Sequence, residues 1–301
     1  MSSITDASAA LTVVVPFVNR WSDLEGCLTA LAEQEGAAVH VIVAERLGGD
    51  VAARIRERFP ETEVLSAPPG TTIPDLRAMA FDRAHSPSVA VIEDHVVVPR
   101  DWAKRMLAAR ETARVVGGAV ANAASERWVD EAAFLCEYSH LLPPIPAGVV
   151  DGITGNNTVY DRALLEKHHD VTHAGLWENH LHDAIRADGV DLVCHPDIVV
   201  GHKMHYTVGL YLSQRYLYSR SYAGARAAAS PFPKRMALAL ASFALPPLLL
   251  MRIVRRCLDK GVDRGVLLRS LPLLALFVGG WAWGEVVGSL LGPGDALSRI
   301  R

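Results

Sequence analysis

Three consecutive polar residues, Glu93, Asp94 and His95, follow an apolar run that is typical of a buried strand. In open α/β sheets, ligands bind beyond the carboxyl ends of the strands. Carboxylate and imidazole groups placed there can hold a divalent cation that bridges two phosphates. The trio therefore indicates a metal and phosphate site, with an ordinary solvated strand end as the alternative.

Other phosphate-binding and nucleophile motifs are missing from the sequence. The turn after the first apolar run, residues 16–20, contains no glycine, so a G-x-G-x-x-G dinucleotide loop cannot form there. No G-x-x-x-x-G-K-[ST] loop and no G-x-S-x-G turn occurs anywhere in the chain. These absences argue against a Rossmann dinucleotide enzyme, a P-loop NTPase and an α/β-hydrolase.

The elements that must position the trio alternate between strand and helix. Four strand patterns each lead into a helical pattern within the first 113 residues, and this order predicts a parallel α/β sheet. Later elements are less regular, with a strand interrupted by a glycine pair, and the soluble domain is expected to end near His202. The predicted strands are 11–18, 38–44, 63–66, 88–93, 115–122 and 191–194, and the predicted helices are one capped by Ser22 or Asp23, then 50–59, 74–84, 101–113, 162–168 and 177–188.

The charge of the chain is distributed unevenly. The 301 residues carry a net charge of −3, but those from Lys203 onward hold 14 Lys and Arg against 4 Asp and Glu. The mean hydropathy of +0.18 is high for a soluble protein. An acidic front part joined to a basic, apolar rear part suggests a cytoplasmic domain at an anionic membrane surface, and it argues against nucleic acid as a partner.

Two apolar segments lie in the basic rear part, at 236–251 and 270–292. A full span needs about 20 apolar residues, so the second is long enough and the first is marginal. The stretch between them is rich in Lys and Arg, and it would lie outside if both segments crossed the membrane. We therefore expect the first segment to lie in the interface or to enter and return. Glu285 in the second segment calls for a partner or a place near the interface.

The cysteines and histidines suggest two further points. The four cysteines are widely spaced and form no C-x-x-C, which is typical of reduced thiols in a cytosolic compartment. His169 and His173 are four residues apart, so they can share one side of a helix. A zinc site there is conceivable, but no third ligand has a dependable spacing, and loop or acceptor-site histidines are the favoured interpretation.

A series of motifs resembles family 2 glycosyltransferases of the GT-A fold over roughly residues 10–225. The motifs are VVVPFVNR, VHVIVAE, VAVIEDHVVVPRDW, GNNTVYDRALL, WENHLHDAIRADG and VVGHK, in this order. The resemblance implies a GT-A-like, mostly parallel sheet flanked by helices. It also implies an inverting transfer of a sugar from a nucleotide-sugar donor, with Mg²⁺ or Mn²⁺ as cofactor.

The resemblance assigns roles to individual residues. Asp94 stands at the metal-binding aspartate of the D-x-D strand end, His202 at a histidine that closes the metal site, and Glu178 at the general base. Arg215 and Arg220 lie in a segment that loosely resembles an arginine-aromatic element of processive members, with anchoring to lipid headgroups as the alternative. The full set is Pro16, Phe17, Asn19, Arg20, Glu45, Arg77, Asp94, Arg215 and Arg220 for the donor, Asn156, Asn157 and Trp177 for the substrates, Asp94, His95 and His202 for the metal, and Glu178 for catalysis.

Three positions depart from the family pattern. Ala44-Glu45 replaces a pair of aspartates, His95 stands where a second aspartate is common, and Trp177 replaces the first acid of a Glu-Asp pair. These departures keep open a catalytically inactive, nucleotide-sugar-binding membrane scaffold. A nucleotidyltransferase is a further alternative, although the glycine-free turn at 16–20 disfavours it.

The sequence therefore predicts a membrane-associated glycosyltransferase with two domains. Residues 1–225 form the GT-A domain, and residues 226–301 form a basic juxtamembrane region with two membrane-associated helices. A glycosyl transfer needs the diphosphate leaving group neutralised and an acceptor hydroxyl deprotonated on the opposite face of the sugar. The expected acceptor is lipid-linked or membrane-proximal, as in bacterial envelope assembly, with membrane lipid as a partner and the catalytic domain on the cytoplasmic side.

Overall fold

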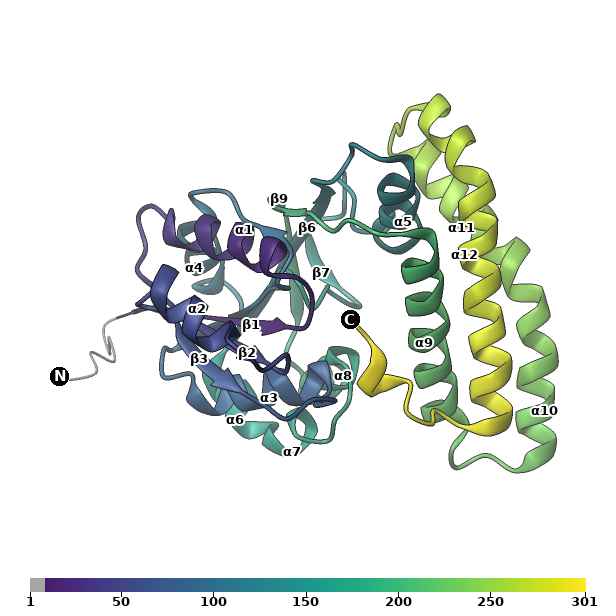
Figure 1. Cartoon of the computed structure of the whole chain (residues 1–301), viewed down its shortest axis with the longest axis horizontal. Coiled ribbons are helices and arrows are strands. Elements are labelled where there is room, and N and C mark those ends of the chain that lie inside the picture. Colours follow the sequence, from purple (N-terminus) through teal and green to yellow (C-terminus); the bar gives the residue numbers. More distant parts are fainter. Residues whose placement is uncertain (1–8) are drawn as a thin grey trace. The chain divides into compact units, whose positions relative to one another are not determined.

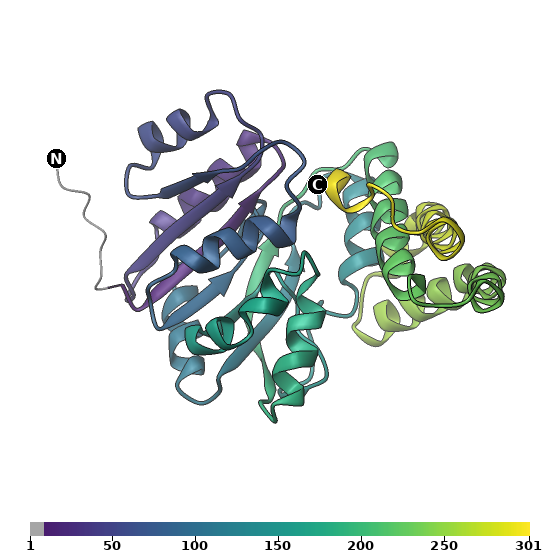
Figure 2. The same cartoon turned by 90° about the horizontal axis from the view of Figure 1, so that it is seen from below.

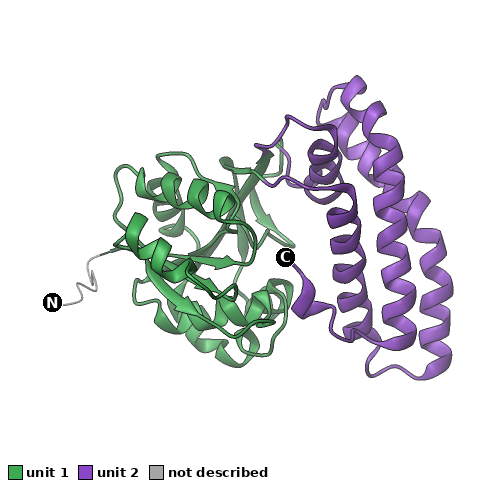
Figure 3. Ribbon diagram, viewed as in Figure 1, with its two compact units in different colours: residues 1–121, 143–203 green, residues 122–142, 204–301 purple. Residues whose placement is uncertain are grey.

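The computed structural model describes residues 9–301, and these form two compact units (Figure 3). Unit 1 comprises the described residues up to 121 together with 143–203, and unit 2 comprises 122–142 and 204–301. Unit 1 ends at Lys203, one residue beyond the predicted end of the soluble domain. The predicted domain boundary at residue 225 stays a prediction. Residues 1–8 of the predicted GT-A domain lie outside the described part of the chain.

Unit 1 is built on one mixed sheet with the strand order β3-β2-β1-β4-β8-β6-β9-β5 (Figure 1). All seven residues of β1 are buried, as expected for a central strand covered on both faces. Helix α3 crosses one face of the sheet and α1 lies on the opposite face (Figure 2). The strands are β1 (Leu11–Phe17), β2 (Val39–Glu45), β3 (Glu63–Ser66), β4 (Ser88–Val91), β5 (Val96–Val97), β6 (Val115–Asn122), β7 (Gly148–Val150), β8 (Thr158–Asp161) and β9 (Leu192–His202).

The helices of unit 1 agree with the predicted ones in number and place up to residue 113, and they differ in their ends. Helix α1 begins at Trp21 after Arg20 and has no side-chain cap, so the predicted cap by Ser22 or Asp23 is wrong. The helices are α1 (Trp21–Ala32), α2 (Val51–Arg58), α3 (Ile73–Arg83), α4 (Trp102–Arg110), α6 (Arg162–Lys167), α7 (His169–Thr172) and α8 (Glu178–Ala187).

The sheet is parallel only in its first half. Strands β1 to β4 pair in parallel, whereas β8 runs antiparallel to both β4 and β6, and β5 and β7 run antiparallel to β9. The expectation of a mostly parallel sheet is therefore corrected to a mixed one. Strand β6 runs unbroken through its glycine pair. A Cβ atom at Gly118 would come within 2.1 Å of the carbonyl oxygen of Ile198, so this glycine lets two backbone segments approach closely.

Unit 2 is helical, and its apolar core is made by α5, α9, α12 and the segment that leads into α9. Helices α5 and α9 have no counterpart among the predicted elements. Arg226 of α9 forms an ion pair with Glu285 of α12, so the acid in the second apolar segment has the partner that it needs. The elements are α5 (Trp128–Tyr138), α9 (Val208–Ala227), α10 (Phe232–Ala241), η1 (Ser242–Ala244), α11 (Leu245–Asp259), α12 (Arg264–Leu291) and η2 (Leu297–Arg299).

Two helical stretches of unit 2 are long and apolar enough to cross a membrane. They are Phe232–Asp259 and Arg264–Leu291, each of 28 residues, with mean hydropathies of 1.9 and 1.6 over the most apolar window. The first joins α10, η1 and α11, and Pro246 and Pro247 lie in the first turn of α11, where proline is tolerated. An interfacial or re-entrant position for this stretch stays a prediction.

A row of glycines lets α12 lie directly against the backbone of α9. A Cβ atom at Gly284 would come within 2.4 Å of the carbonyl oxygen of Tyr216, and one at Gly288 within 2.5 Å of that of Arg220. Gly279, on the same helix, has no neighbouring atom within 4 Å of its Cβ position. Small residues at this spacing are a common way to bring apolar helices into close contact.

We expect Gly284→Ala to destabilise unit 2 by about 1–3 kcal/mol, because the added methyl group forces two backbones apart. Gly279→Ala is the matched control, and it should leave the stability unchanged or raise it by up to about 1 kcal/mol through helix propensity. Thermal unfolding of the full-length protein in detergent measures both. Equal melting temperatures for the two variants would contradict the close packing of α9 and α12.

Candidate active site

Asp94 is buried beyond the end of β4, where it holds the turn that follows β1. Its Oδ2 atom accepts hydrogen bonds from the backbone N–H groups of Val18 and Asn19 at 2.9 and 3.0 Å. Its Oδ1 atom accepts one from the Asn19 side chain at 2.9 Å and lies 2.8 Å from Nδ1 of His95. Both carboxylate oxygens are therefore engaged by protein groups. Asp94 braces the β1 turn and orients His95.

The side chains of Glu93, His95 and His202 converge beside this brace. Their ligand atoms all lie within 4.8 Å of one another, and both histidines are buried. The Nε2 atoms of the two histidines are 2.9 Å apart, and Nε2 of His95 is 3.3 Å from Oε2 of Glu93. The pairing of β5 with β9 sets Val96 opposite His202 and so brings His202 to this end of β4.

The charges in this cluster are unevenly shared. Burial lowers the pKa of His95, but hydrogen bonds to Asp94 and Glu93 outweigh burial and raise this pKa to about 10. Burial and the charge of His95 lower the pKa of His202 to about 3. Burial raises the pKa of Glu93, but the hydrogen bond to His95 and the nearby positive charges outweigh it and lower this pKa to about 2. Glu93 is thus ionised and His202 neutral, which are the forms that bind cations, whereas His95 would have to release a proton to a bound cation.

The loop before β8 connects this cluster to a second one. Asn156 donates a hydrogen bond from its side chain to Oε2 of Glu93 at 3.2 Å. Asn157 is fully buried, and its amide nitrogen donates to the carbonyl oxygens of Ala119 and Ile198. Its Oδ1 atom accepts from the indole of Trp102 at 3.0 Å. Asn156 therefore positions Glu93, and Asn157 ties β6, β8 and β9 together.

The second cluster pairs Arg77 of α3 with Glu178, the first residue of α8. Nη1 of Arg77 lies 2.7 Å from Oε2 of Glu178, and the arginine side chain is only 7% exposed while that of Glu178 is 26% exposed. Burial lowers the pKa of Arg77, but the carboxylates of Glu178 and Glu93 outweigh this and raise it. A helix N-terminus also favours a carboxylate at this place. The Glu178 carboxylate is thus oriented by Arg77 and remains accessible to solvent.

Because Gly155 has no side chain, the carboxylate of Glu178 can lie directly against the backbone at this position. A Cβ atom at Gly155 would come within 2.5 Å of Oε1 of Glu178, and the Gly155 carbonyl oxygen lies 3.4 Å from Nη2 of Arg77. A pocket opens at this point in unit 1. Its lining includes Arg77, Gly155, Tyr160, Trp177, Glu178 and Leu181.

Comparison with known families assigns this arrangement. The sequence pattern described as "Glycosyl transferase family 2" matches residues 12–168, which is more than half of the chain. The chain belongs to glycosyl transferase family 2. The site described above lies on the sheet that this match covers, together with the neighbouring elements α8 and β9.

Solved structures show the same GT-A fold as this family 2 chain. S. aureus TarS 1–349 aligns with a TM-score of 0.51 at 13% identity, covering 92% of this chain and 90% of that one. The mannosyltransferase PcManGT from Pyrobaculum calidifontis, in complex with GDP-Man and Mn²⁺, aligns with a TM-score of 0.53 at 19% identity, covering 96% and 86%. At such identities the likeness establishes the fold alone. No match is found among curated proteins.

The remaining donor residues predicted for this glycosyltransferase lie in different surroundings. Pro16 and Phe17 are buried in β1, and Arg20 is exposed just after it. Glu45 is buried, and its Oε2 atom accepts hydrogen bonds from the backbone N–H groups of Leu47 and Gly48 at 2.7 and 2.9 Å. Its carboxylate therefore shapes the turn after β2, and a contact with the nucleotide base stays a prediction.

The two arginines predicted near the apolar segments belong to unit 2. The guanidinium of Arg215 lies 4.2 Å from the ring centre of Trp281 and 3.6 Å from a carboxylate oxygen of Glu137. Arg220 donates from Nε to the carbonyl oxygen of Gly292 at 3.3 Å. Both have partners within their own unit, so pyrophosphate binding by them stays a prediction.

One buried histidine beside the pocket makes stability depend on pH. Nε2 of His182 lies 2.8 Å from the hydroxyl of Tyr160, and burial lowers the pKa of His182 from 6.5 to about 4. Between pH 6.5 and about pH 4, His182 therefore binds a proton in the unfolded chain but not in the folded chain. This contribution to stability is fully present above pH 6.5 and is lost as the pH falls toward 4.

We expect His182→Gln to remove that pH dependence, because glutamine keeps a hydrogen-bonding group for Tyr160 and does not titrate. The wild-type protein should lose roughly 2–3 kcal/mol more than the variant on acidification across this window. Denaturant unfolding of both proteins at pH 7.5 and near pH 4.5 measures the difference. Parallel losses in the two proteins would show that His182 is not buried as a neutral group.

Proposed function

We propose that the chain is a metal-dependent, inverting glycosyltransferase that moves a sugar from a nucleotide-sugar donor to a lipid-linked or envelope glycan acceptor at a membrane. The main support for this proposal is that Glu178 lies in the same unit as Glu93, His95 and His202, which can together bind a cation. Asn156 contacts Glu93 of that cluster, and the adjacent Gly155 contacts Arg77 and Glu178. The loop that contains Gly155 and Asn156 thus lies next to both the proposed base, Glu178, and the proposed cation ligand Glu93.

The residues at the end of β4 fit a divalent cation, with one change from the sequence prediction. Glu93, His95 and His202 supply one carboxylate oxygen and two imidazole nitrogens. Asp94, predicted as a ligand, instead contacts Nδ1 of His95, as carboxylates do behind many metal-binding histidines. We propose Glu93, His95 and His202 as the ligands. A donor set with two imidazoles suits Mn²⁺ better than Mg²⁺, which prefers an all-oxygen shell.

The cation, when bound, neutralises the diphosphate of the leaving group. Glu178 then accepts the proton of the acceptor hydroxyl as the hydroxyl oxygen attacks the anomeric carbon from the face opposite the diphosphate. Arg77 holds Glu178 in place through one of its two carboxylate oxygens. A single displacement of this kind inverts the anomeric centre. PcManGT in complex with GDP-Man and Mn²⁺ and TarS in complex with UDP show related folds holding such groups.

The membrane part of the proposal rests on unit 2. Its two long apolar helical stretches and its Lys- and Arg-rich composition suit an anionic, cytoplasmic membrane surface. A lipid-linked acceptor would be reached without leaving that surface. The cytoplasmic position of unit 1 follows from the positive charge of unit 2 under the same proposal.

A panel of nucleotide sugars tests the proposal on the full-length protein. We expect Mn²⁺ together with one nucleotide sugar to raise the melting temperature, and the same pair to support slow donor hydrolysis. Stabilisation without hydrolysis or transfer to membrane lipids would favour the inactive scaffold instead. Release of pyrophosphate from a nucleoside triphosphate and a sugar phosphate would favour a nucleotidyltransferase.

A further inference from the structure

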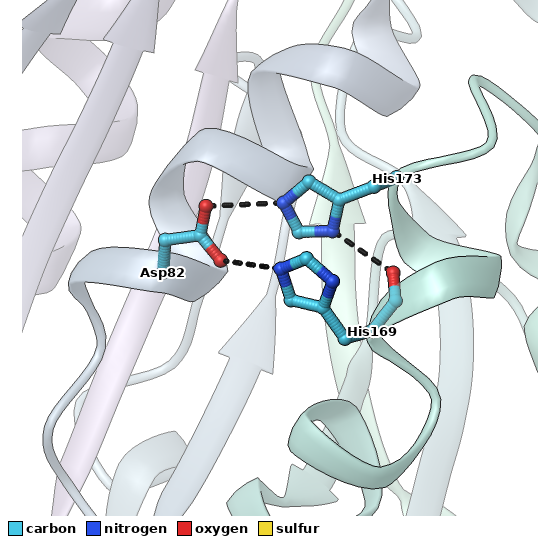
Figure 4. A group of neighbouring side chains, drawn as sticks. All are labelled: Asp82, His169 and His173. Carbon is cyan, nitrogen blue, oxygen red and sulfur yellow. Dashed lines mark hydrogen bonds and ion pairs between the residues drawn. The ribbon is translucent and has the colours of Figure 1, made fainter.

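A second group of metal-ligand side chains lies on the surface of unit 1, away from the residues described so far. It consists of Asp82 near the end of α3, His169 at the start of α7 and His173 just after α7 (Figure 4). All three side chains are exposed, and their ligand atoms lie within 4.8 Å of one another. The sequence showed only the two histidines, and the fold adds the third group from a helix 87 residues earlier in the chain.

The two imidazole rings present the same edge to Asp82. They stack with their centres 3.7 Å apart and their planes 15° apart. Nε2 of His173 is 3.0 Å from Oδ2 of Asp82, and Nε2 of His169 is 3.6 Å from Oδ1. Ligand atoms of one tetrahedral zinc ion lie about 3.3 Å apart, given bonds of about 2.0–2.1 Å. The observed separations lie on either side of that value. Because rings stacked in this way cannot both direct a nitrogen lone pair at one ion, binding would rotate at least one ring out of the stack.

The orientation of His173 is set by neighbouring polar groups. Its Nδ1 atom lies 2.9 Å from the carbonyl oxygen of His169 and 3.0 Å from Oγ1 of Thr172. Nε2, the other ring nitrogen, faces a carboxylate oxygen of Asp82 (Figure 4). Metal-binding histidines are commonly held by a polar contact at the nitrogen that does not bind the metal.

The three ligand atoms come from α3 and from the two ends of α7, and they lie close enough together for one divalent cation to contact all of them. We propose that Asp82, His169 and His173 bind Zn²⁺, with water as the fourth ligand at this exposed position. Two imidazoles and a carboxylate form a ligand set that suits zinc.

A cation at this place would join α3 to α7. Arg77 of α3 and Thr172 of α7 both line the pocket that contains Glu178. The proposed zinc ion would therefore link α3 and α7, which both line the pocket, without itself lying in the pocket. The site uses none of the residues proposed for the donor, so it does not depend on the proposed glycosyl transfer.

Zn²⁺ binding to the metal-stripped, full-length protein tests the site directly. The double variant His169→Gln/His173→Gln should bind one equivalent of Zn²⁺ less than the wild type in isothermal titration. Asp82→Asn should weaken binding at that equivalent at least about tenfold, since it removes one of three protein ligands. The control is His85→Gln, which alters another exposed histidine just after α3 and should bind as the wild type does.

A second measurement separates this equivalent from Zn²⁺ at Glu93, His95 and His202. In a His202→Gln background, Zn²⁺ should still raise the melting temperature, and the added His169→Gln/His173→Gln pair should abolish that rise. Unchanged stoichiometry and an unchanged thermal shift in the His169→Gln/His173→Gln protein would overturn the proposal. The cluster would then be an exposed histidine-aspartate ion pair.

Discussion

Glu178→Gln is expected to abolish glycosyl transfer while leaving donor binding intact. Glutamine has nearly the same shape, but it cannot accept the proton of the acceptor hydroxyl. General-base catalysis contributes about 10²–10⁴-fold, so turnover should fall by at least that lower factor. The dissociation constant for the donor should stay nearly unchanged, because the donor diphosphate is proposed to meet the cation cluster and not Glu178.

The same variant separates a catalytic role from a purely structural one. Glu178 forms an ion pair with Arg77. If the role of Glu178 were only structural, Glu178→Gln would lower the melting temperature, and adding Arg77→Met to that variant would lower it no further. Glu63→Gln is the matched control, because Glu63 pairs with Arg83 at a similar distance of 2.8 Å on the surface. The control should retain full turnover. Near-normal turnover by Glu178→Gln would remove Glu178 as the base.

Glu93→Gln and Asp94→Asn are expected to fail in different ways, although the two residues are adjacent. Glu93→Gln should weaken Mn²⁺ binding by about 10–100-fold or more and abolish Mn²⁺-dependent transfer, with little change in melting temperature. Glutamine retains a hydrogen-bond acceptor for Asn156 but lacks the negative charge that a cation requires. Calorimetric Mn²⁺ titration and thermal unfolding report the two properties separately.

Asp94→Asn should instead lower the stability of the fold. Its carboxylate accepts two backbone and one side-chain hydrogen bond from the turn after β1, and it contacts His95. An amide nitrogen in place of one oxygen would face another donor, so we expect a loss of about 2–4 kcal/mol. A stable Asp94→Asn protein that loses Mn²⁺, beside a Glu93→Gln protein that binds normally, would restore Asp94 as the ligand.

Most of the first half of the fold could be predicted because its signals are local. Strand β3 lies at the predicted residues 63–66, β1 ends one residue before its predicted end, and β2 is shifted by one residue at both ends. Buried parallel strands are continuous apolar runs, and the helices between them have apolar residues at helical spacing. The missed elements include β5, β7, β8, α5, α7 and α9. Strand β8 is four residues long and follows a glycine- and asparagine-rich loop, so it lacks the length that marks a strand.

The residues of the candidate site were predicted by type, and their roles stay predictions. His95, His202 and Glu178 were identified from motifs, and all three lie in unit 1. Glu93 belonged to the trio but not to the predicted ligand set, and the structure places it beside the two histidines. Glu93, Asp94 and His95 lie between β4 and β5, in a turn closed by a hydrogen bond from the N–H of Val96 to the carbonyl oxygen of Glu93, so strand alternation could not assign the directions of their side chains.

The sequence by itself determined the fold class, the family and the uneven charge of the chain, because these depend on residue types along a continuous stretch. Only the tertiary structure decided which carboxylate faces the other ligands, since that depends on the N–H groups of a turn 75 residues away. It also determined that Asp82 lies beside His169 and His173, and that Arg226 forms an ion pair with Glu285. Such partners lie on other elements, and a local pattern carries no record of which distant side chain the folded backbone brings near.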